Sequence, residues 1–495
     1  MNSFTDRVER WGLFEWKLEG TESDNPSGEV RVRAEFRKGS RYFETEGFDD
    51  GKGCYVIRFM PDEEGVWSVR TVSEQASFHG LAGEFQCLPA SDGNHGPVRA
   101  AGLHFTYADG TPFLPFGTTS LAWHVQEERY VEQTLQTLAG APFNKIRMSL
   151  LPPREAVTGQ ESIPFALREN GSADPERLNL AYFARLEKAL TALLRLGVEA
   201  ELILFPAISG EWGLEAMTLE EKNRYVRYVV ARLAAYRHVW WTLEEIDSRS
   251  YPAGQEDREV LLRTLRECDY AGHLLTVNGR VDGYDWGRPS ITHISLRHED
   301  VKVASEFTQN YGKPVVVDVC GWEGDGASRW NSLTAEEMVY RLWEGLARGG
   351  YASHGEFLLQ PGQLRWSVHG GTLLGEAPAR LAFLKGLLQD APSGLTYSRE
   401  RHDASTLERK GEYYLQYFGP HRFSSRTFAM PEGRYGAELI DTWNMTIEPL
   451  ESAYEHRFQI VLPGELFHAL RLQRTGEAQT EAPVETGEEV EENDD

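Results

Sequence analysis

Two apolar segments with the character of buried strands each end in acidic residues, whose side chains could do acid–base or nucleophilic chemistry. The first, VWWTL, runs directly into Glu244, Glu245 and Asp247, and the second, PVVV, runs into Asp318 and Val319. Carboxylates at two strand ends can face one another across a bound molecule, one as a proton donor and the other as a nucleophile. The first end is rich in acid, whereas the second offers Asp318 and then an apolar residue.

Several acidic residues are candidates for the catalytic role. Glu245 is the leading candidate for a general acid and Glu244 the second. Alternatively, Glu245 is a strand-end carboxylate in a salt bridge, for example with Arg249. Crowding of like charges around Glu245 would raise at least one pKa, which suits a proton donor. Glu323 is either a displaced nucleophile or a structural residue of a turn.

Asp318 is a further catalytic candidate, although in a regular strand it should point opposite to position 319 and therefore towards the surrounding helices. Glu356 could act as a catalytic carboxylate or as a ligand-binding one. His293 and His354 are interpreted as pocket hydrogen-bonding residues or as core histidines rather than metal ligands. No metal or cofactor is predicted.

The remaining strand ends carry aromatic, amide and basic residues that could bind a sugar. Tryptophan faces stack on sugar C–H groups, and sugar hydroxyls need hydrogen-bond donors and acceptors. The tryptophans could instead pack at the rim of the fold. The predicted ligand-binding residues are Trp123, Arg147, Trp212, Asn278, His293, His354, Glu356 and Trp366.

Between about residues 100 and 390 the chain alternates strand-like and helix-like segments. Ala181–Leu196 has the apolar stripe of a helix, and Thr218 with Glu221 forms a capping-box pattern that begins the next helix. Alternation of this length favours a (β/α)8 TIM barrel, whose chemistry gathers at the carboxyl-terminal strand ends. The eight predicted strands are Phe113–Thr118, Phe143–Leu150, Val198–Phe205, His238–Leu243, Gly272–Val277, Ser290–Leu296, Pro314–Asp318 and Gly355–Leu359.

Short strand patterns flank this region on both sides. Residues 1–90 alternate in short runs separated by Pro, Gly and Asp clusters, which predicts an Ig-like β-sandwich. Residues 91–390 form the predicted barrel, and residues 391–472 a small β-domain. Residues 473–495 are predicted to be a disordered acidic tail, because this stretch is rich in acid and has no aromatic residue. The predicted fold class is therefore α/β, a TIM barrel between two β-domains.

Composition narrows the possible partners. The chain has 495 residues and a formal net charge of −25, which argues against nucleic-acid binding because phosphate contacts need clustered Lys and Arg. The four cysteines have neither metal-ligand spacing nor a disulfide framework. No apolar run is long enough to span a membrane, and the N-terminus has no signal core, so a cytoplasmic protein is expected.

The motifs together resemble one family. HGPVR, FTYADGTPFLPFGTTSLAW, APFNKIRMSLLP, KPVVVDVCGWEG, GGYASHGE and GGTLLGEAPARLAFLK, in this order, are similar to segments of the apiosidase-like, endoglucanase-type branch of clan-A glycoside hydrolases. The segments before and after the barrel resemble that family's sandwich and β-domain. The resemblance covers almost the whole chain. It implies a retaining glycosidase ancestry, with one carboxylate as acid/base and another as nucleophile.

This sequence departs from the family pattern at specific positions. The family's fourth strand ends in Trp-Ser-Leu-Ala-Asn-Glu-Tyr-Asp; here the segment is one residue shorter, and Glu245 matches the acid/base best. The seventh strand ends in Asp-Glu-Cys-Gly, and here Val319 replaces the nucleophile Glu. His-Pro-Tyr-Asp after the third strand has become Pro-Ala-Ile-Ser, and Ile-His-Asn after the fifth has become Val277-Asn278-Gly279 with Thr276 before it.

Two functions remain open on this basis. The first is a glycoside hydrolase-type protein that binds a plant-type oligosaccharide at the barrel mouth, with Glu245 as acid/base. The second is a catalytically impaired pseudoenzyme that binds a glycan or acts as a scaffold. Valine can neither attack the anomeric carbon nor stabilise an oxocarbenium ion, so position 319 separates the two. The sugar, its linkage and the oligomeric state are not specified.

Overall fold

The computed structural model describes residues 3–20, 31–246, 255–280, 284–359, 364–400 and 403–477. The chain divides into two compact units, Met1–Gly394 and Leu395–Asp495. Asp247, Arg249 and residues 478–495 of the acidic tail lie outside the described residues. The predicted domain boundaries remain predictions. In the described part of the chain, no helix combines the length and apolarity needed to cross a bilayer.

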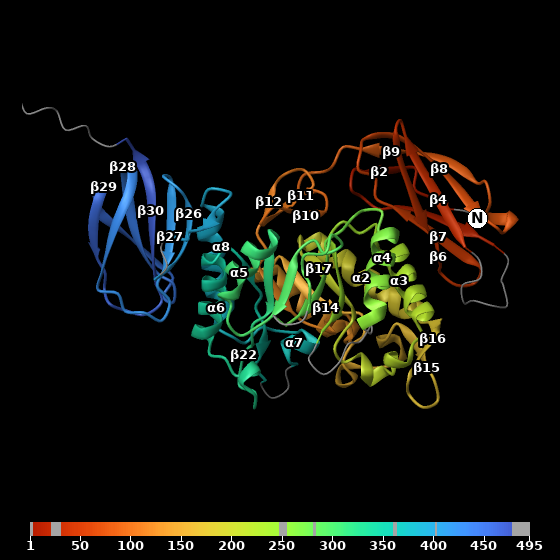
Figure 1. Cartoon of the computed structure of the whole chain (residues 1–495). Coiled ribbons are helices and arrows are strands. Elements are labelled where there is room, and N and C mark those ends of the chain that lie inside the picture. The colour runs from red at the N-terminus through yellow and green to blue at the C-terminus, as the bar shows by residue number, and fades with distance from the viewer. Residues whose placement is uncertain are drawn as a thin grey trace, which may run out of the picture. The chain divides into compact units, whose positions relative to one another are not determined.

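Eight parallel strands form the central sheet of the first unit (Figure 1). Its two ends meet, because Thr118 and His354 form a parallel bridge and the His354 N–H donates to the Gly117 carbonyl at 2.8 Å. The sheet is therefore closed into a barrel, which confirms the predicted fold class. In order around the barrel, the strands are β13 (Gly117–Thr119), β14 (Lys145–Ser149), β17 (Glu199–Phe205), β18 (Val239–Glu245), β19 (Leu275–Gly279), β20 (Ile294–Arg297), β21 (Val315–Val319) and β23 (Tyr351–Ala352).

Helices follow most of these strands and surround the barrel, with α2, α3 and α4 on one side and α5, α6 and α8 on the other (Figure 1). Local signals place their ends: Asn179 caps α2 by accepting from the Tyr182 N–H, and Gly197 ends it with φ 68°. The predicted capping box of Thr218 and Glu221 begins α3. The helices are α1 (Glu128–Gly140), α2 (Leu180–Leu196), α3 (Leu219–Leu233), α4 (Gln255–Cys268), α5 (Val303–Tyr311), α6 (Ala335–Ala347), α7 (Trp366–His369) and α8 (Ala377–Gln389).

The first seven predicted strands each overlap a barrel strand, but the eighth was wrong. Gly355–Leu359 was predicted, whereas the barrel is completed by β23 at Tyr351–Ala352 and by the bridge at His354. The later residues contain β24 (Glu356–Phe357), which pairs with β22 (Glu323–Gly324) in a separate two-stranded sheet. β23 is only two residues long, so residues 351–354 carry no long apolar run of the kind that marks the other strands. A prediction from apolar runs therefore misses this strand.

The N-terminal part of the first unit consists of two sheets that share one aromatic core. Phe14 stacks on Phe85 with centroids 4.3 Å apart, and Phe36 stacks on Phe59 at 4.1 Å, in each case across the two sheets. These contacts build a β-sandwich core from alternate strand residues. One sheet contains β1 (Ser3–Phe4), β3 (Phe14–Glu19), β7 (Cys54–Phe59) and β6 (Phe48–Asp49); the other contains β2 (Arg7–Glu9), β9 (Ala82–Leu88), β8 (Gly65–Ser73), β4 (Val32–Lys38) and β5 (Arg41–Glu46).

A buried ion-pair cluster joins this sandwich to the barrel. Arg58 of β7 pairs with Glu187 of α2 at 2.7 Å and with Glu15 of β3 at 2.8 Å. Arg58 also donates to the backbone carbonyl of Arg232 in α3 at 2.8 Å. Its side chain is 8% exposed. The sandwich is thus fixed to the helical layer by a charged side chain that is almost completely desolvated.

A three-stranded antiparallel sheet covers the amino-terminal end of the barrel. It consists of β10 (Val98–Ala101), β11 (His104–Tyr107) and β12 (Pro112–Phe113). Phe105 of this sheet contacts Trp240 and Tyr351 with ring centroids 5.2 and 5.5 Å apart. The contacts close this end with aromatic packing. Any ligand site must therefore lie towards the carboxyl-terminal ends of the strands.

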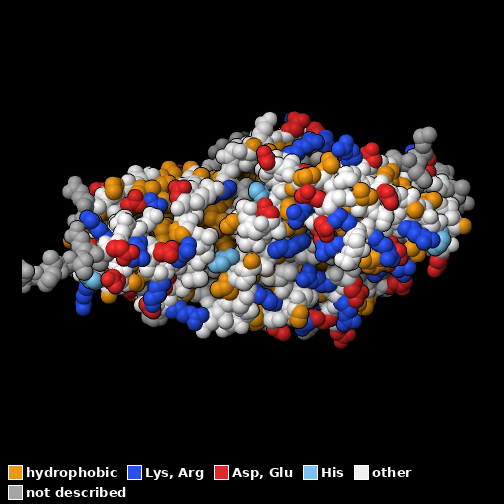
Figure 2. All heavy atoms as spheres, turned by 90° about the horizontal axis from the view of Figure 1, so that it is seen from above, with side chains coloured by type: hydrophobic (Ala, Val, Ile, Leu, Met, Phe, Trp, Pro, Cys, Tyr) orange, Lys and Arg blue, Asp and Glu red, His pale blue; other side chains and the backbone are white. Residues whose placement is uncertain are grey.

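The second unit is a six-stranded antiparallel sheet with its own core, which includes Tyr414, Tyr435 and Leu470. Its strands are β25 (Thr396–Tyr397), β26 (Ser405–Arg409), β27 (Tyr413–Tyr417), β30 (His468–Gly476), β28 (Ser425–Asp441) and β29 (Thr446–Val461). Over the face in Figure 2, acidic and basic side chains are interspersed.

Candidate functional site

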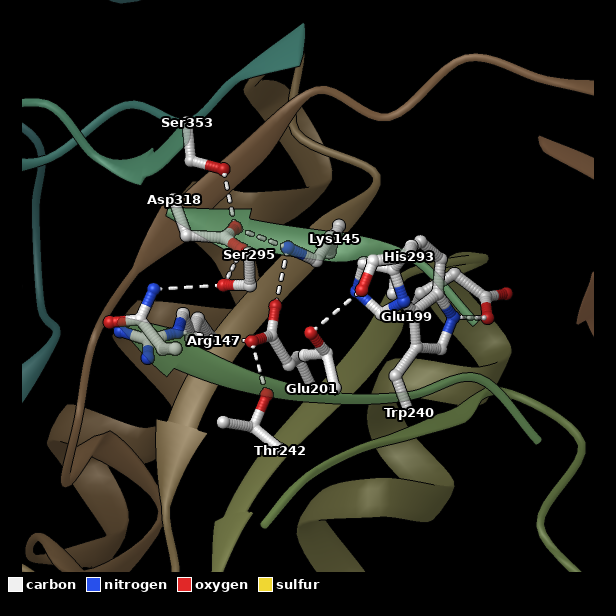
Figure 3. Close-up of polar contacts among 12 residues, drawn as sticks. Lys145, Arg147, Glu199, Glu201, Trp240, Thr242, His293, Ser295, Asp318 and Ser353 are labelled. Atoms are coloured by element: carbon white, nitrogen blue, oxygen red, sulfur yellow. Dashed lines mark hydrogen bonds and ion pairs between the residues drawn. The ribbon is translucent and has the colours of Figure 1, made fainter. Parts of the chain in front are cut away.

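Charged side chains from neighbouring strands meet inside the barrel. Arg147 of β14 donates through Nε to Oε1 of Glu201 in β17 at 3.0 Å. The Thr242 hydroxyl of β18 donates to the same oxygen at 2.7 Å. Lys145, two residues before Arg147 and on the same face of β14, also pairs with Glu201 (Figure 3). Glu201 therefore connects three strands in the barrel interior.

Lys145 also reaches the opposite side of the barrel. Its Nζ lies 2.6 Å from Oδ1 of Asp318 in β21, and Asp318 further accepts from the Ser295 hydroxyl at 2.6 Å and the Ser353 hydroxyl at 3.0 Å (Figure 3). The expectation that Asp318 points towards the helices was wrong. Ser295 faces the interior and is the register partner of Val316, so Asp318, two residues further, shares that face.

A β-bulge decides which of two consecutive glutamates enters the barrel. Between β18 and β19, Thr242 pairs with Thr276 and Glu245 with Asn278, so β18 has one extra residue. Glu244 turns outward and forms a buried ion pair with Arg258 of α4. Glu245 turns inward. The structure thus separates the two leading acid candidates onto opposite faces of the strand.

Glu245 is held by two contacts at the carboxyl-terminal end of β18. Its Oε1 lies 3.0 Å from Nη2 of Arg147, and its Oε2 accepts from the Ala207 N–H at 3.2 Å. The Glu245 side chain is 15% exposed, whereas Glu201 and Asp318 are 0% exposed. Of these three interior carboxylates, Glu245 is the one that solvent reaches.

The network is electrostatically paired. Burial alone would raise the pKa of Glu201, but the adjacent Lys145 and Arg147 cations hold it below its ordinary value. Burial would likewise lower the pKa of Arg147, yet Glu245 and Glu201 raise it. Two cations, Lys145 and Arg147, thus face the three carboxylates of Glu201, Asp318 and Glu245.

A second polar group lies at the amino-terminal end of the barrel. Glu199, the first residue of β17, accepts from Trp240 Nε1 at 2.8 Å, and burial raises the pKa of Glu199 to about 8. The ring of His293 lies 5.5 Å from that of Trp240 and 5.6 Å from that of Phe105, and burial lowers its pKa to about 4. The predicted position of His293 at the mouth was wrong, because β20 begins after it, at Ile294.

The three tryptophans predicted as sugar platforms are packed inside the protein. Trp123 and Trp366 are 0% exposed and Trp212 is 2% exposed. Trp366 donates through Nε1 to the Thr118 hydroxyl at 2.9 Å, and Trp212 to the Pro152 carbonyl at 2.9 Å. A stacking platform must expose a ring face, and none of the three does so here. Their burial agrees with the alternative interpretation, in which the three tryptophans pack at the rim of the fold and do not stack on a sugar.

His354, Glu356 and Glu323 lie on the outer side of β23. The His354 ring stacks on Phe143 with centroids 4.9 Å apart, and its Nδ1 lies 3.2 Å from the Thr118 hydroxyl. Thr118 is the register partner of Ile146, between the inward-facing Lys145 and Arg147, and therefore points outward. The three residues are brought together, but away from Glu245.

Two further predicted positions are buried at the strand ends. Asn278 is 2% exposed and donates through Nδ2 to the Ser295 hydroxyl at 2.8 Å, which joins it to the Asp318 network. Val319 is 6% exposed and is the register partner of Arg297. The side chain that follows Asp318 in the strand is therefore a largely buried hydrocarbon.

Comparison with known proteins places this barrel in a family. The apiosidase-like catalytic domain model matches residues 100–290. A solved structure described as a "putative glycoside hydrolase" from Bacteroides vulgatus ATCC 8482 is 32% identical, covers 95% of this chain and 100% of its own, and superposes with a TM-score of 0.88. The chain belongs to the apiosidase-like glycoside hydrolase family.

Other matches to this apiosidase-like protein are more distant. A family 5 glycoside hydrolase from Bacteroides vulgatus ATCC 8482 is 14% identical over 77% of the chain and 94% of its own, with a TM-score of 0.60, which supports the fold alone. Two domain families of unknown function match the flanks, DUF5060 over residues 7–74 and DUF5605 over residues 402–473. No curated protein matches the chain.

Sequence reasoning missed part of the interior network. Lys145, Glu201, Thr242, Ser295 and Ser353 were not singled out, although all of them contact one another or Asp318. A signal was available: charged residues recur with a spacing of two within otherwise apolar strands, at 145 and 147 and at 199 and 201. Such a pattern predicts charge inside a closed sheet, where it must be paired.

Proposed function

We propose that this apiosidase-like protein binds a carbohydrate at the carboxyl-terminal end of its barrel and does not perform the double displacement of retaining glycosidases. One observation carries the proposal: Val319 occupies the position at which the family resemblance implies the nucleophile. A covalent glycosyl intermediate requires a carboxylate about 5 Å from the acid/base. A valine side chain cannot form that bond.

The other interior carboxylates are poorly suited to replace this nucleophile. Glu201 is paired with Lys145 and Arg147, and Asp318 with Lys145 and two hydroxyl groups. Both are 0% exposed. Attack on a sugar would require one of them to leave buried ion pairs, which costs several kcal/mol on the order-of-magnitude scale for such pairs.

A hydrolase that uses Glu245 is the second candidate, favoured by one observation. Glu245 lies at a strand end, faces inward and is 15% exposed. It could donate a proton to a leaving group while water attacks from the other side of the sugar. That route needs a general base across the sugar, at a separation of about 6.5–9.5 Å.

The experiment compares binding with turnover in the same protein. Glycan-array screening of the unmodified chain identifies a ligand, isothermal calorimetry measures its affinity, and a panel of aryl glycosides, including an apioside, measures turnover. We expect binding without turnover. We also expect Val319→Glu to give little recovery, because the pocket differs from the family pattern at several positions besides 319. If the unmodified protein turns over a glycoside and Glu245→Gln abolishes that turnover, the result would support the hydrolase instead.

Glu244→Gln is the matched control, since it changes the neighbouring carboxylate on the outer face of the same strand. It should leave sugar affinity unchanged, whereas Glu245→Gln should change it. Efficient turnover by the unmodified protein would refute the proposal. Absence of binding to any glycan would refute both functions and leave a structural role.

A further inference from the structure

A second cluster of ionisable side chains lies outside the barrel interior, at the start of α8. Glu323 of β22 and Glu356 of β24 are register partners in the small two-stranded sheet, and His354 lies two residues before Glu356. One ligating atom from each of the three residues lies within 4.8 Å of the others. All three side chains are buried, with relative exposures of 4%, 0% and 1% for Glu323, Glu356 and His354.

Backbone N–H groups hold the two carboxylates in place. Glu356 accepts from the N–H groups of Leu374 and Gly375 at 2.8 and 2.9 Å. Glu323 accepts from those of Glu376 and Ala377 at 2.7 and 3.3 Å. Each carboxylate oxygen thus uses one lone pair on the segment that leads into α8. A second lone pair on each oxygen remains for another partner.

The imidazole of His354 directs an unpartnered nitrogen at these carboxylates. Its Nε2 forms no hydrogen bond, and the nearest carboxylate oxygen, Oε2 of Glu323, is 3.8 Å away. Its Nδ1 lies 3.2 Å from the Thr118 hydroxyl, which already accepts from Trp366. Stacking on Phe143 fixes the ring plane. A buried nitrogen at this distance from a carboxylate is too far for a hydrogen bond and lacks the partner that burial demands.

The cluster also lacks a compensating cation among the described side chains. No lysine or arginine in the described part of the chain forms an ion pair with Glu323 or Glu356. The two buried carboxylates would therefore place two negative charges in a desolvated site without a Lys or Arg partner among the described residues.

We propose that Glu323, His354 and Glu356 bind one divalent transition-metal cation of the zinc class. A single doubly charged ion would balance both carboxylates and supply a partner for Nε2. The donor set of one imidazole nitrogen and two carboxylate oxygens suits zinc rather than calcium or magnesium, which prefer oxygen ligands alone. Water would complete a tetrahedral shell.

The surroundings of His354 match those of a metal-binding histidine. Such residues usually donate the other ring N–H to a neighbouring acceptor, which fixes the tautomer. Thr118 is placed to accept from Nδ1 in this way. Binding would draw the three ligand atoms together, since ligands about 2.0 Å from zinc in a tetrahedron lie about 3.3 Å apart. The ion would connect β22 and β24 to the end of β23 and thereby stabilise the barrel closure.

The test uses the full-length protein and does not depend on sugar binding or turnover. After chelator treatment and dialysis against zinc, elemental analysis should find about one zinc per chain. The thermal unfolding midpoint should rise by several degrees with zinc. His354→Gln and Glu356→Gln should each reduce the bound zinc at least tenfold and abolish this rise. Both variants should retain the wild-type circular dichroism spectrum in chelator.

His104→Gln is the control, because it removes a partly buried histidine of the same unit that lies outside the cluster, and it should leave zinc binding unchanged. Zinc retained by both His354→Gln and Glu356→Gln would place the ion elsewhere and overturn the proposal. Absence of zinc binding and of any midpoint shift in the wild-type protein would also overturn it.

Discussion

The Nη2 atom of Arg147 lies 3.0 Å from Oε1 of Glu245, while Nε of the same guanidinium lies 3.0 Å from Oε1 of Glu201. One side chain therefore joins the partly exposed acid at the barrel mouth to a fully buried acid beneath it. The fork of donors on a guanidinium can serve two carboxylates without reorienting. Arg147 acts here as the positioning residue of Glu245.

Arg147→Met should lower the free energy of unfolding by about 3–5 kcal/mol, because it leaves a buried carboxylate with one cation fewer. Urea unfolding followed by fluorescence measures the change. In the double variant Arg147→Met/Glu201→Gln the loss should be smaller than the sum of the two single losses, since the neutral amide needs no cation. Strictly additive losses would contradict the proposed coupling between the two residues.

Glu199 should make the protein less stable as the pH rises through neutrality. Its pKa is raised to about 8 in the folded state, against 4.5 as the ordinary value, so the folded state binds one proton more between these values. The free energy of unfolding should therefore fall by about 1.4 kcal/mol per pH unit at most over that range. This contribution is fully present below pH 4.5 and is lost as the pH approaches 8.

Glu199→Gln tests whether Glu199 causes this pH dependence of the free energy of unfolding. The amide stays neutral at every pH and can still accept from Trp240 Nε1. Unfolding in urea at pH 5.5, 7.0 and 8.5 should show a flatter dependence for the variant and a stability advantage over wild type at the highest pH. Other titrating groups are common to both proteins and cancel in the comparison. Parallel curves for the two proteins would contradict the assignment.

Arg58→Leu should weaken the attachment of the sandwich to the barrel. The substitution removes buried pairs to Glu187 and Glu15, and a loss of about 3–5 kcal/mol is expected for a pair broken in this way. Thermal unfolding should begin at a lower temperature, and limited proteolysis should cleave between the two parts more quickly. Arg33→Leu is the control, because its pair with Glu44 is exposed and should contribute little. Equal effects of both substitutions would refute the argument.

Much of the architecture was predictable from the sequence because it depends on local periodicity. The apolar run before Asp318 and the stripe of Ala181–Leu196 each specify an element with its buried face. Seven barrel strands were located by such runs. The eighth strand was predicted too far along the chain, because Tyr351–Ala352 is too short to show an apolar pattern.

The site was less predictable because orientation depends on register between strands. Glu244 and Glu245 are adjacent in sequence, and the bulge against β19 determines which one faces the interior. His293 was assigned to the wrong end because its strand begins one residue later. The approach of Glu323 to His354 depends on a pairing between β22 and β24 that leaves no local signal.

The extra residue of β18 determines which of the side chains that follow it face the barrel interior. If the same residues paired regularly, with Glu244 opposite Asn278, Glu244 would share the inner face with Thr242 and Glu245 would turn outward. The pairing of this strand end, with no change of sequence, therefore determines which acid stands at the mouth. Among relatives of this protein, the presence of this extra residue should predict whether an acid faces the ligand better than the presence of a glutamate in the sequence does.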